Sequence, residues 1–253
     1  RLVRLGSAFE ARRGGRHDSP TKDETYNIEA IILNRKSFSE NSSRVAVYSL
    51  QSGKLELTVR GAKKIGSKLS CHLEPISLTK IMVVRGRRYD YVGAAVSENC
   101  FCHIKNDLAK LAAAGGAVKV VEQLIKPGLA DEKIFELLKD YLEALAAVKT
   151  DFEVLRWFFV LKLLAKLGHQ PELSRCLACA GKIQPGGNRF DLARGGLVCG
   201  RCADLKEANQ LALSDDGIKL LRLAAAADFK KLAKVKVSKK LGEEIKKIAD
   251  SFF

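Results

Sequence analysis

Two Cys-x-x-Cys pairs constrain this chain more than any other feature. They contain four of its seven cysteines, and 19 residues, 180 to 198, separate them, a spacing typical of a zinc ribbon. Each two-residue gap brings two thiolates to one metal, and two such turns supply the four ligands of a tetrahedral structural Zn2+. Four thiolates leave no open position for water, so we expect one structural zinc per chain, bound by Cys176, Cys179, Cys199 and Cys202.

Other interpretations of the cysteines are weaker. A thioredoxin-like redox pair follows a buried strand, and neither pair does. Two disulfides would conflict with the reducing compartment that an odd cysteine count and no secretion signal favour, and four free cysteines at this spacing would be a coincidence. A second metal site is disfavoured because nothing in the spacing brings its candidate ligands together: Cys71, His72, Cys100, Cys102 and His103.

Residues 26–103 have the pattern of a small β-domain. Five short runs rich in β-branched and aromatic residues, separated by turn signals, predict strands at 27–34, 44–50, 54–60, 76–84 and 89–97. The segments QSG (51–53) and RGRR (85–88) are short enough for hairpin connections. Five strands in about 75 residues suit a closed barrel, and we expect one of the oligonucleotide-binding (OB) type.

From residue 104 the spacing of apolar residues becomes helical. It predicts helices at 107–125, 131–148, 151–168, 214–233 and 238–253, with Ser214 and Ser238 as N-caps. The predicted fold is therefore α+β: an OB-fold domain at 26–103, then an α-helical domain at 104–253 with an inserted zinc ribbon at 175–203. Residues 1–25 are interpreted as a disordered lead-in or a remnant of cloning or processing. No apolar run is long enough for a membrane span, so we expect no membrane partner.

Positive charge predicts a polyanionic partner. The chain has 44 Lys and Arg against 29 Asp and Glu, a net charge of +15. Within 26–103 the basic residues gather at presumed loops: Arg35 and Lys36 after the first strand, then VRGAKKIGSKL and the turn VRGRRY. Phe38, Tyr48, Tyr89 and Tyr91 are candidate surfaces for stacking bases. Solvated charges and core aromatics are the alternative, but the combination favours nucleic acid.

Enzymatic patterns are missing. AAAGGAVKV lacks the Walker pattern of a phosphate-binding loop, and the four scattered histidines form no catalytic constellation. We therefore expect a non-enzymatic, ATP-independent protein, with the cytoplasm as its compartment.

Several segments resemble one known family in order and composition. AIILNRKSFSENSSRVAVYSLQSGKLELTVRGAKKIGSKLSCHLEPISL is similar to the opening domain of the bacterial recombination mediator family RecO. LLAKLGHQPELSRCLACAG and GGLVCGRC resemble the family's helix end and its two cysteine pairs. The resemblance covers roughly 26–227, and the chain ends at KIADSFF, before a further helical tail that the family would have.

The resemblance implies a fold and a function. RecO-like proteins have an N-terminal OB barrel, a C-terminal helical domain and, in some members, a zinc ribbon. They bind single- and double-stranded DNA, anneal complementary strands and act with RecR to place RecA on DNA coated by single-strand-binding protein, whose acidic C-terminal tail they also bind. Such a protein would be bacterial, cytoplasmic and nucleoid-associated. The matching barrel segments imply DNA contacts at Arg35, Lys36, Arg44, Arg60, Lys63, Lys64 and Lys68, with Arg87 and Arg88 as further candidates.

Two other classes of function stay open at this point. A zinc-ribbon, OB-fold factor of transcription or translation would also be basic and cytoplasmic, but it would bind a polymerase or a ribosome. A nuclease would need a cluster of acidic metal ligands, for which the sequence offers no pattern.

Overall fold

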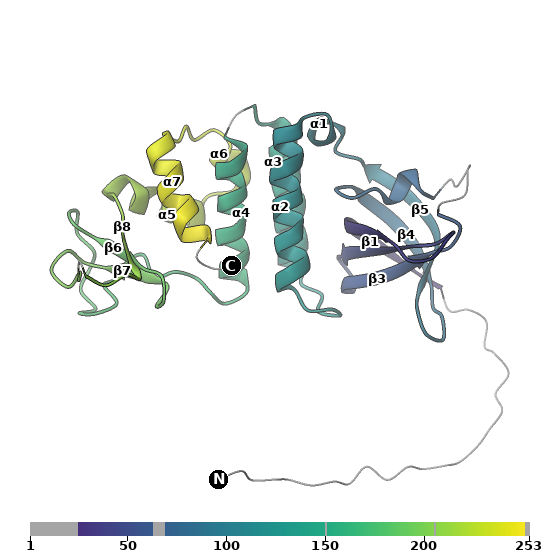
Figure 1. Ribbon diagram of the computed structural model, residues 1–253, viewed down its shortest axis with the longest axis horizontal. Helices are drawn as coiled ribbons and strands as arrows, with labels where there is room; N and C mark the ends of the chain where they lie inside the picture. The colour runs from purple at the N-terminus through teal and green to yellow at the C-terminus, as the bar shows by residue number, and fades with distance from the viewer. Residues whose placement is uncertain (1–24, 63–68, 150, 205, 251–253) are drawn as a thin grey trace, which may run out of the picture.

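The structure is a computed structural model that describes residues 25–62, 69–149, 151–204 and 206–250. Its elements form three groups along the long axis: a strand barrel, a middle layer of long helices, and a small sheet with further helices (Figure 1). Apart from Thr25, the predicted lead-in lies outside the described residues, and so do Lys63, Lys64 and Lys68. Within the described ranges no helix is long and apolar enough to cross a membrane.

Five strands form a closed barrel in the order β1-β2-β3-β5-β4. β3 meets β5 in parallel at Thr58 and Tyr91, while the other neighbours are antiparallel, including both predicted hairpins. β1 is longer than predicted because its first half pairs with β4 and its second half with β2. The strands are β1 (Thr25–Ser37), β2 (Ser43–Ser49), β3 (Gly53–Val59), β4 (Leu78–Val84) and β5 (Tyr91–Asn99), with a short 3-10 turn η1 (Cys71–Leu73) before β4.

The apolar run in β1 is buried on both faces. Ile28, Ala30 and Ile32 belong to the core inside the barrel. Ile31 and Leu33 belong instead to the larger core that the helices form. Because successive strand residues point to opposite faces, one strand supplies both cores, and this joins the barrel to the helices.

The middle layer consists of helices that follow the barrel. Asp107 and Asp131 accept backbone N–H groups of the first turns of α2 and α3, as helix N-caps do. α4 packs against α2, α3, α5 and α7, and its sequence is accordingly apolar on most sides. The helices are α1 (Cys102–Lys105), α2 (Leu108–Leu124), α3 (Glu132–Ala147) and α4 (Phe152–Lys166).

The cysteine segment forms a small sheet between α4 and α5. β6 (Arg189–Asp191) and β7 (Gly196–Val198) form a hairpin, and β8 (Gln210–Ala212) adds a third strand beside β6. Ser214 accepts the Gly217 N–H at 3.0 Å, as predicted for an N-cap. The helix predicted at 214–233 is divided into two, since α6 starts anew with its own cap, Asp228. The last helices are α5 (Asp215–Ala226), α6 (Phe229–Leu232) and α7 (Lys239–Asp250).

Polar contacts fasten the barrel to the helices. Tyr48 is fully buried and its hydroxyl donates to the carbonyl of Asp131 at 3.3 Å, so its predicted role as a stacking surface is wrong. The Nζ of Lys54 donates to the carbonyls of Glu122 and, at 3.1 Å, Ile125. These carbonyls lie at the end of α2, where no backbone N–H group of the next helical turn is present to bond them. The domain boundary after His103 stays a prediction.

Candidate metal centre and nucleic-acid interface

Four sulfur atoms gather in the small sheet. Each Cys-x-x-Cys pair lies on a tight turn: the N–H of Ala180 donates to the Cys176 carbonyl at 2.8 Å, and that of Ala203 to the Cys199 carbonyl at 2.9 Å. All four Sγ atoms lie within 4.8 Å of one another: those of Cys176, Cys179, Cys199 and Cys202. The structure thus brings together the four residues that the spacing singled out.

The geometry of the cluster fits a zinc ion. Zn–S distances of about 2.3 Å in a tetrahedron place sulfur atoms about 3.8 Å apart. The Sγ atoms of Cys179 and Cys199 are 3.9 Å apart. The backbone N–H groups of Ala178 and Cys199 point at the Cys176 Sγ at 3.4 and 3.3 Å, as donors around a metal-bound thiolate do.

The thiols of the cluster also differ in their pKa values. Burial raises the pKa of Cys176, but backbone N–H donors, that of Cys199 first, outweigh it and lower this pKa to about 6. Hydrogen bonds to Cys199 and Cys179 raise the pKa of Cys202 to about 12. Four adjacent thiolates repel one another, so a cation is needed to keep all four deprotonated.

Arginine and aromatic side chains alternate on the barrel surface. The guanidinium of Arg44 lies 3.9 Å from the ring centre of Phe38 and 4.7 Å from that of Tyr89. The guanidinium of Arg60 lies 3.7 Å from the ring centre of Tyr91. Phe38 and Tyr89 are 46% and 38% exposed, so nucleic-acid bases can reach their rings. With Arg88, 5.4 Å from the Tyr89 ring, these residues are here named the Arg–aromatic cluster: Phe38, Arg44, Arg60, Arg88, Tyr89 and Tyr91.

Arg35 and Lys36 do not lie in a loop as expected. They are within β1, because residues 34–37 continue to pair with β2. The guanidinium of Arg35 donates to the Ser70 carbonyl at 3.1 Å and to the Glu74 carboxylate at 2.9 Å. Lys36 is mostly exposed, and its Nζ lies 3.7 Å from a carboxylate oxygen of Glu122. Arg35 thus holds the segment before β4 in place, while Lys36 is more accessible.

The turn between β4 and β5 carries the other predicted arginines. Arg87 and Arg88 are exposed there, as the sequence predicted for a hairpin connection. Arg85, in the same turn, lies 5.3 Å from the ring centre of Tyr26. This turn therefore extends the basic surface of the Arg–aromatic cluster.

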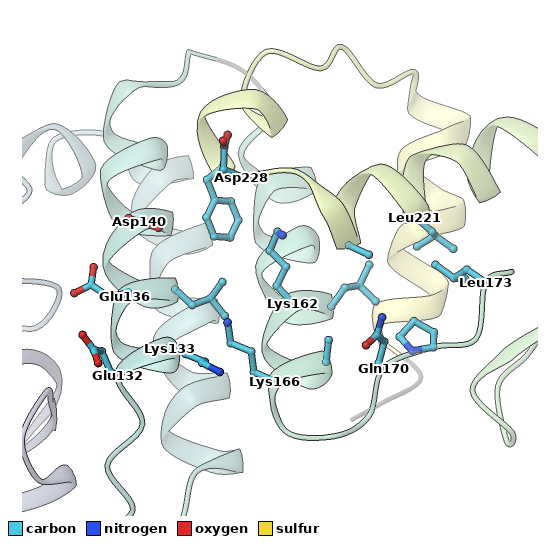
Figure 2. A pocket seen from close by; sticks show the side chains of 16 residues that line it. Glu132, Lys133, Glu136, Asp140, Lys162, Lys166, Gln170, Leu173, Leu221 and Asp228 are labelled. Atoms are coloured by element: carbon cyan, nitrogen blue, oxygen red, sulfur yellow. The ribbon is translucent and has the colours of Figure 1, made fainter.

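Sequence reasoning missed a groove of about 640 Å³ between α3, α4, α5 and α6. Its lining includes apolar Leu161 and Phe229. Four acids also line the groove: Glu132 and Glu136, on the outer side of α3 in Figure 2, with Asp140 and Asp228. Three lysines extend between α3 and α4 in the same view: Lys133, Lys162 and Lys166. Burial lowers the pKa of Lys162, which lies 6.0 Å from the Phe229 ring centre.

A second basic surface was also missed. Residues 228–250 contain eight lysines against four acids, and this local charge count is the signal that would have found them. The apolar residues of α7, Ile245, Ile248 and Ala249, are buried, which leaves its lysines toward solvent. These residues are here named the α6–α7 lysine surface: Lys230, Lys231, Lys234, Lys236, Lys239, Lys240, Lys246 and Lys247.

Two protein-family models match the chain. The model for the N terminal of recombination protein O matches residues 24–101, and the model for its C terminal matches residues 105–253. The chain belongs to the RecO family. The first RecO model spans all five barrel strands, and the second spans α2 to α7 with the cysteine cluster. The family match thus reaches residue 253, beyond the segment in which a resemblance was noted.

Individual RecO proteins match over most of their length. The chain is 29% identical to the DNA repair protein RecO of Desulforamulus reducens over 227 residues, which cover 90% of this chain and 88% of the relative. It is 31% identical to the DNA repair protein RecO of a Roseiflexus species over 201 residues, which cover 79% and 70%. Both alignments are long enough to include parts of the barrel and of the helices.

Proposed function

We propose that this RecO family member is a DNA-binding recombination mediator without enzymatic activity. It anneals complementary strands and, with RecR, helps to load RecA onto DNA coated by single-strand-binding protein during recombinational repair. Family membership and the relatives' name, DNA repair protein RecO, support the repair role. The observation that carries the DNA contact is the Arg–aromatic cluster on the barrel.

DNA binds on an OB-type barrel in this proposal. Single-stranded bases stack on exposed rings such as Phe38 and Tyr89, while guanidinium groups contact the phosphates, as other barrels of this type bind single strands. The full proposed contact set is Arg35, Lys36, Arg44, Arg60, Lys63, Lys64, Lys68, Arg87 and Arg88. Since Arg35 is engaged with Ser70 and Glu74, its contribution is the smallest of the described members.

Annealing requires that two strands approach one another. The α6–α7 lysine surface lies on the other side of the middle helices from the barrel (Figure 1). Two basic surfaces on one molecule neutralise phosphates of two strands and so lower the repulsion that opposes pairing. A net charge of +15 supports contacts with both single- and double-stranded DNA.

The cysteine cluster binds one structural Zn2+ in this proposal. When bound, the ion fills its coordination shell with four thiolates and therefore supplies no catalytic water. The chain's own part is to hold Cys176, Cys179, Cys199 and Cys202 on two tight turns beside β6 and β7.

The groove between α3 and α4 is proposed as the binding site for the acidic tail of single-strand-binding protein. Leu161 and Phe229 give the groove its apolar lining, and Lys133, Lys162 and Lys166 add positive charge beside four acids of the same lining. Lys166→Ala should weaken binding of a fluorescent tail peptide, whereas Lys246→Ala, outside the groove, should not. Equal affinities of the two variants would remove the groove from this role.

Annealing of coated complementary strands, with and without RecR, tests the proposed function. Arg44→Ala/Arg60→Ala should slow annealing strongly, while Lys219→Ala, paired with Asp216 outside both basic surfaces, should not. Failure of the wild type to anneal would contradict the proposal. A pull-down that recovers a polymerase or ribosome instead of RecR would favour a transcription or translation factor, and cleavage of DNA with Mg2+ would indicate a nuclease. A mediator of this kind acts in the cytoplasm, at the nucleoid.

A further inference from the structure

Two exposed cysteines outside the metal cluster lie almost in bonding contact. The Sγ atoms of Cys100 and Cys102 are 2.6 Å apart, and both side chains are exposed. β5 ends at Asn99, and Cys102 is the first residue of α1, so the pair lies where the chain passes from the barrel to the helices.

An unusual backbone turn at Phe101 brings the two thiols together. Phe101 has φ 46° and ψ 47°, a left-handed conformation that side chains other than glycine adopt rarely. Its ring is only 3% exposed, its N–H donates to Asn99 Oδ1 at 2.9 Å, and its carbonyl accepts the Ile104 N–H at 2.9 Å. In an extended strand the Cα atoms of residues two apart are about 6.6 Å from one another, near the upper limit for a disulfide. The anchored turn shortens that separation.

The spacing of this pair does not suit a metal. Two sulfur ligands of one zinc lie about 3.8 Å apart, and the Sγ atoms of Cys179 and Cys199 in the metal cluster are 3.9 Å apart. The 2.6 Å between Cys100 and Cys102 is much shorter, and it is closer to the S–S bond length of about 2.05 Å. In the part of the chain that the structure describes, the only group of three or more metal-ligand residues is the cluster in the small sheet.

We propose that Cys100 and Cys102 form a peroxide-reactive dithiol that closes to a reversible disulfide. The Cys100 thiolate attacks one oxygen of hydrogen peroxide, the O–O bond breaks, the other oxygen leaves as hydroxide and takes up a proton to form water, and Cys100 becomes a sulfenic acid. The sulfur of Cys102 then attacks the Cys100 sulfur, an S–S bond forms, and water leaves. In total two thiols and one hydrogen peroxide give one disulfide and two waters, and a thiol reductant restores the dithiol by exchange.

The surroundings of the pair determine which thiol attacks the oxidant and which one resolves the sulfenic acid. A hydrogen bond with Cys102 lowers the pKa of Cys100, and the charge of Lys105 lowers it further. The same hydrogen bond raises the pKa of Cys102. Cys100 is therefore the thiol that attacks the oxidant, and Cys102 is the thiol that resolves the sulfenic acid.

Peptide mass spectrometry of the zinc-loaded full-length protein tests this inference. Trypsin cuts after Arg88 and Lys105 and releases residues 89–105, which contain Cys100 and Cys102 and no other cysteine. Cys71 falls in a separate peptide, residues 69–80. After hydrogen peroxide and then iodoacetamide, peptide 89–105 should be two hydrogens lighter and unalkylated, and prior reduction should restore two alkylation sites. The metal content is followed in the same samples.

Single variants separate the two thiols. Cys102→Ser should leave a sulfenic acid on Cys100 that dimedone traps, whereas Cys100→Ser should form no disulfide within peptide 89–105. Cys71→Ser should oxidise like the wild type. The inference is overturned if peptide 89–105 stays fully alkylated under conditions that oxidise Cys71. It is equally overturned if Cys100 forms its disulfide with a cysteine other than Cys102.

Discussion

The guanidinium of Arg60 lies 3.7 Å from the ring centre of Tyr91, across the parallel contact that closes the barrel. β3 and β5 pair at Thr58 and Tyr91, so the closure itself places an arginine just after β3 over a ring at the start of β5. Stacking on the ring orients the guanidinium plane while leaving its N–H groups available to phosphates. The topology thus produces part of the surface that we propose for DNA.

Arg60→Ala should weaken binding of single-stranded oligonucleotides. The loss of one phosphate contact should weaken binding about equally for all sequences, and the salt dependence should become shallower by about one unit of slope. Arg60→Lys keeps the charge but not the planar group, so it should restore the slope and only part of the affinity. Fluorescence anisotropy over a series of salt concentrations measures both. Identical affinities for wild type and Arg60→Ala would exclude this residue from the interface.

Gly53→Ala should destabilise the contact between barrel and helices. Gly53 has φ +66°, and a Cβ there would lie 2.1 Å from the carbonyl oxygen of Leu129. Gly128 has φ +77°, and a Cβ added there would have open space for 4 Å around it, so Gly128→Ala isolates the backbone strain. The backbone strain alone should lower the free energy of unfolding of Gly128→Ala by about 1–2 kcal/mol. Gly53→Ala should lower it by more than Gly128→Ala does, because the clash with Leu129 is added. Urea denaturation compares the two variants, and equal losses would contradict the close approach.

Much of the fold was predictable because its signals are local. Alternation of apolar residues located all five strands, and the cysteine spacing located the metal cluster. The ends of β1 were not predictable, because the polar residues 34–37 are extended only through pairing with β2. Tyr48 looks like any surface aromatic in the sequence, and its packing into the core that the helices form buries it. The left-handed turn at Phe101 has no glycine to reveal it, so the Cys100–Cys102 contact was missed.

Removal of zinc should unfold the small sheet and leave the barrel's DNA contacts in place. Metal binding at such a site is coupled to local folding, so the effect should be confined to the elements that hold the thiolates. Cys176→Ser should lose the metal and raise amide hydrogen exchange in residues 175–212, with little change around the barrel. Cys71→Ser, at an exposed cysteine outside the cluster, is the matched control. Unchanged protection of residues 175–212 in the metal-free protein would contradict a structural role.

The pH dependence of Cys100 alkylation should reveal how Cys102 changes the pKa of Cys100. The thiolate is the reactive form, and the hydrogen bond with Cys102, then backbone hydrogen bonds and last the charge of Lys105, lower the pKa of Cys100. Its rate of reaction with iodoacetamide should therefore reach half of its maximum below pH ~8.5, the usual value for a cysteine thiol. Cys102→Ala removes the donor and should shift the midpoint upward, while Lys105→Gln should shift it less, because the Lys105 charge is the smaller cause. Mass spectrometry of the peptide that contains Cys100 gives the rates. A midpoint that stays in place or falls in Cys102→Ala would show that Cys102 does not stabilise the thiolate.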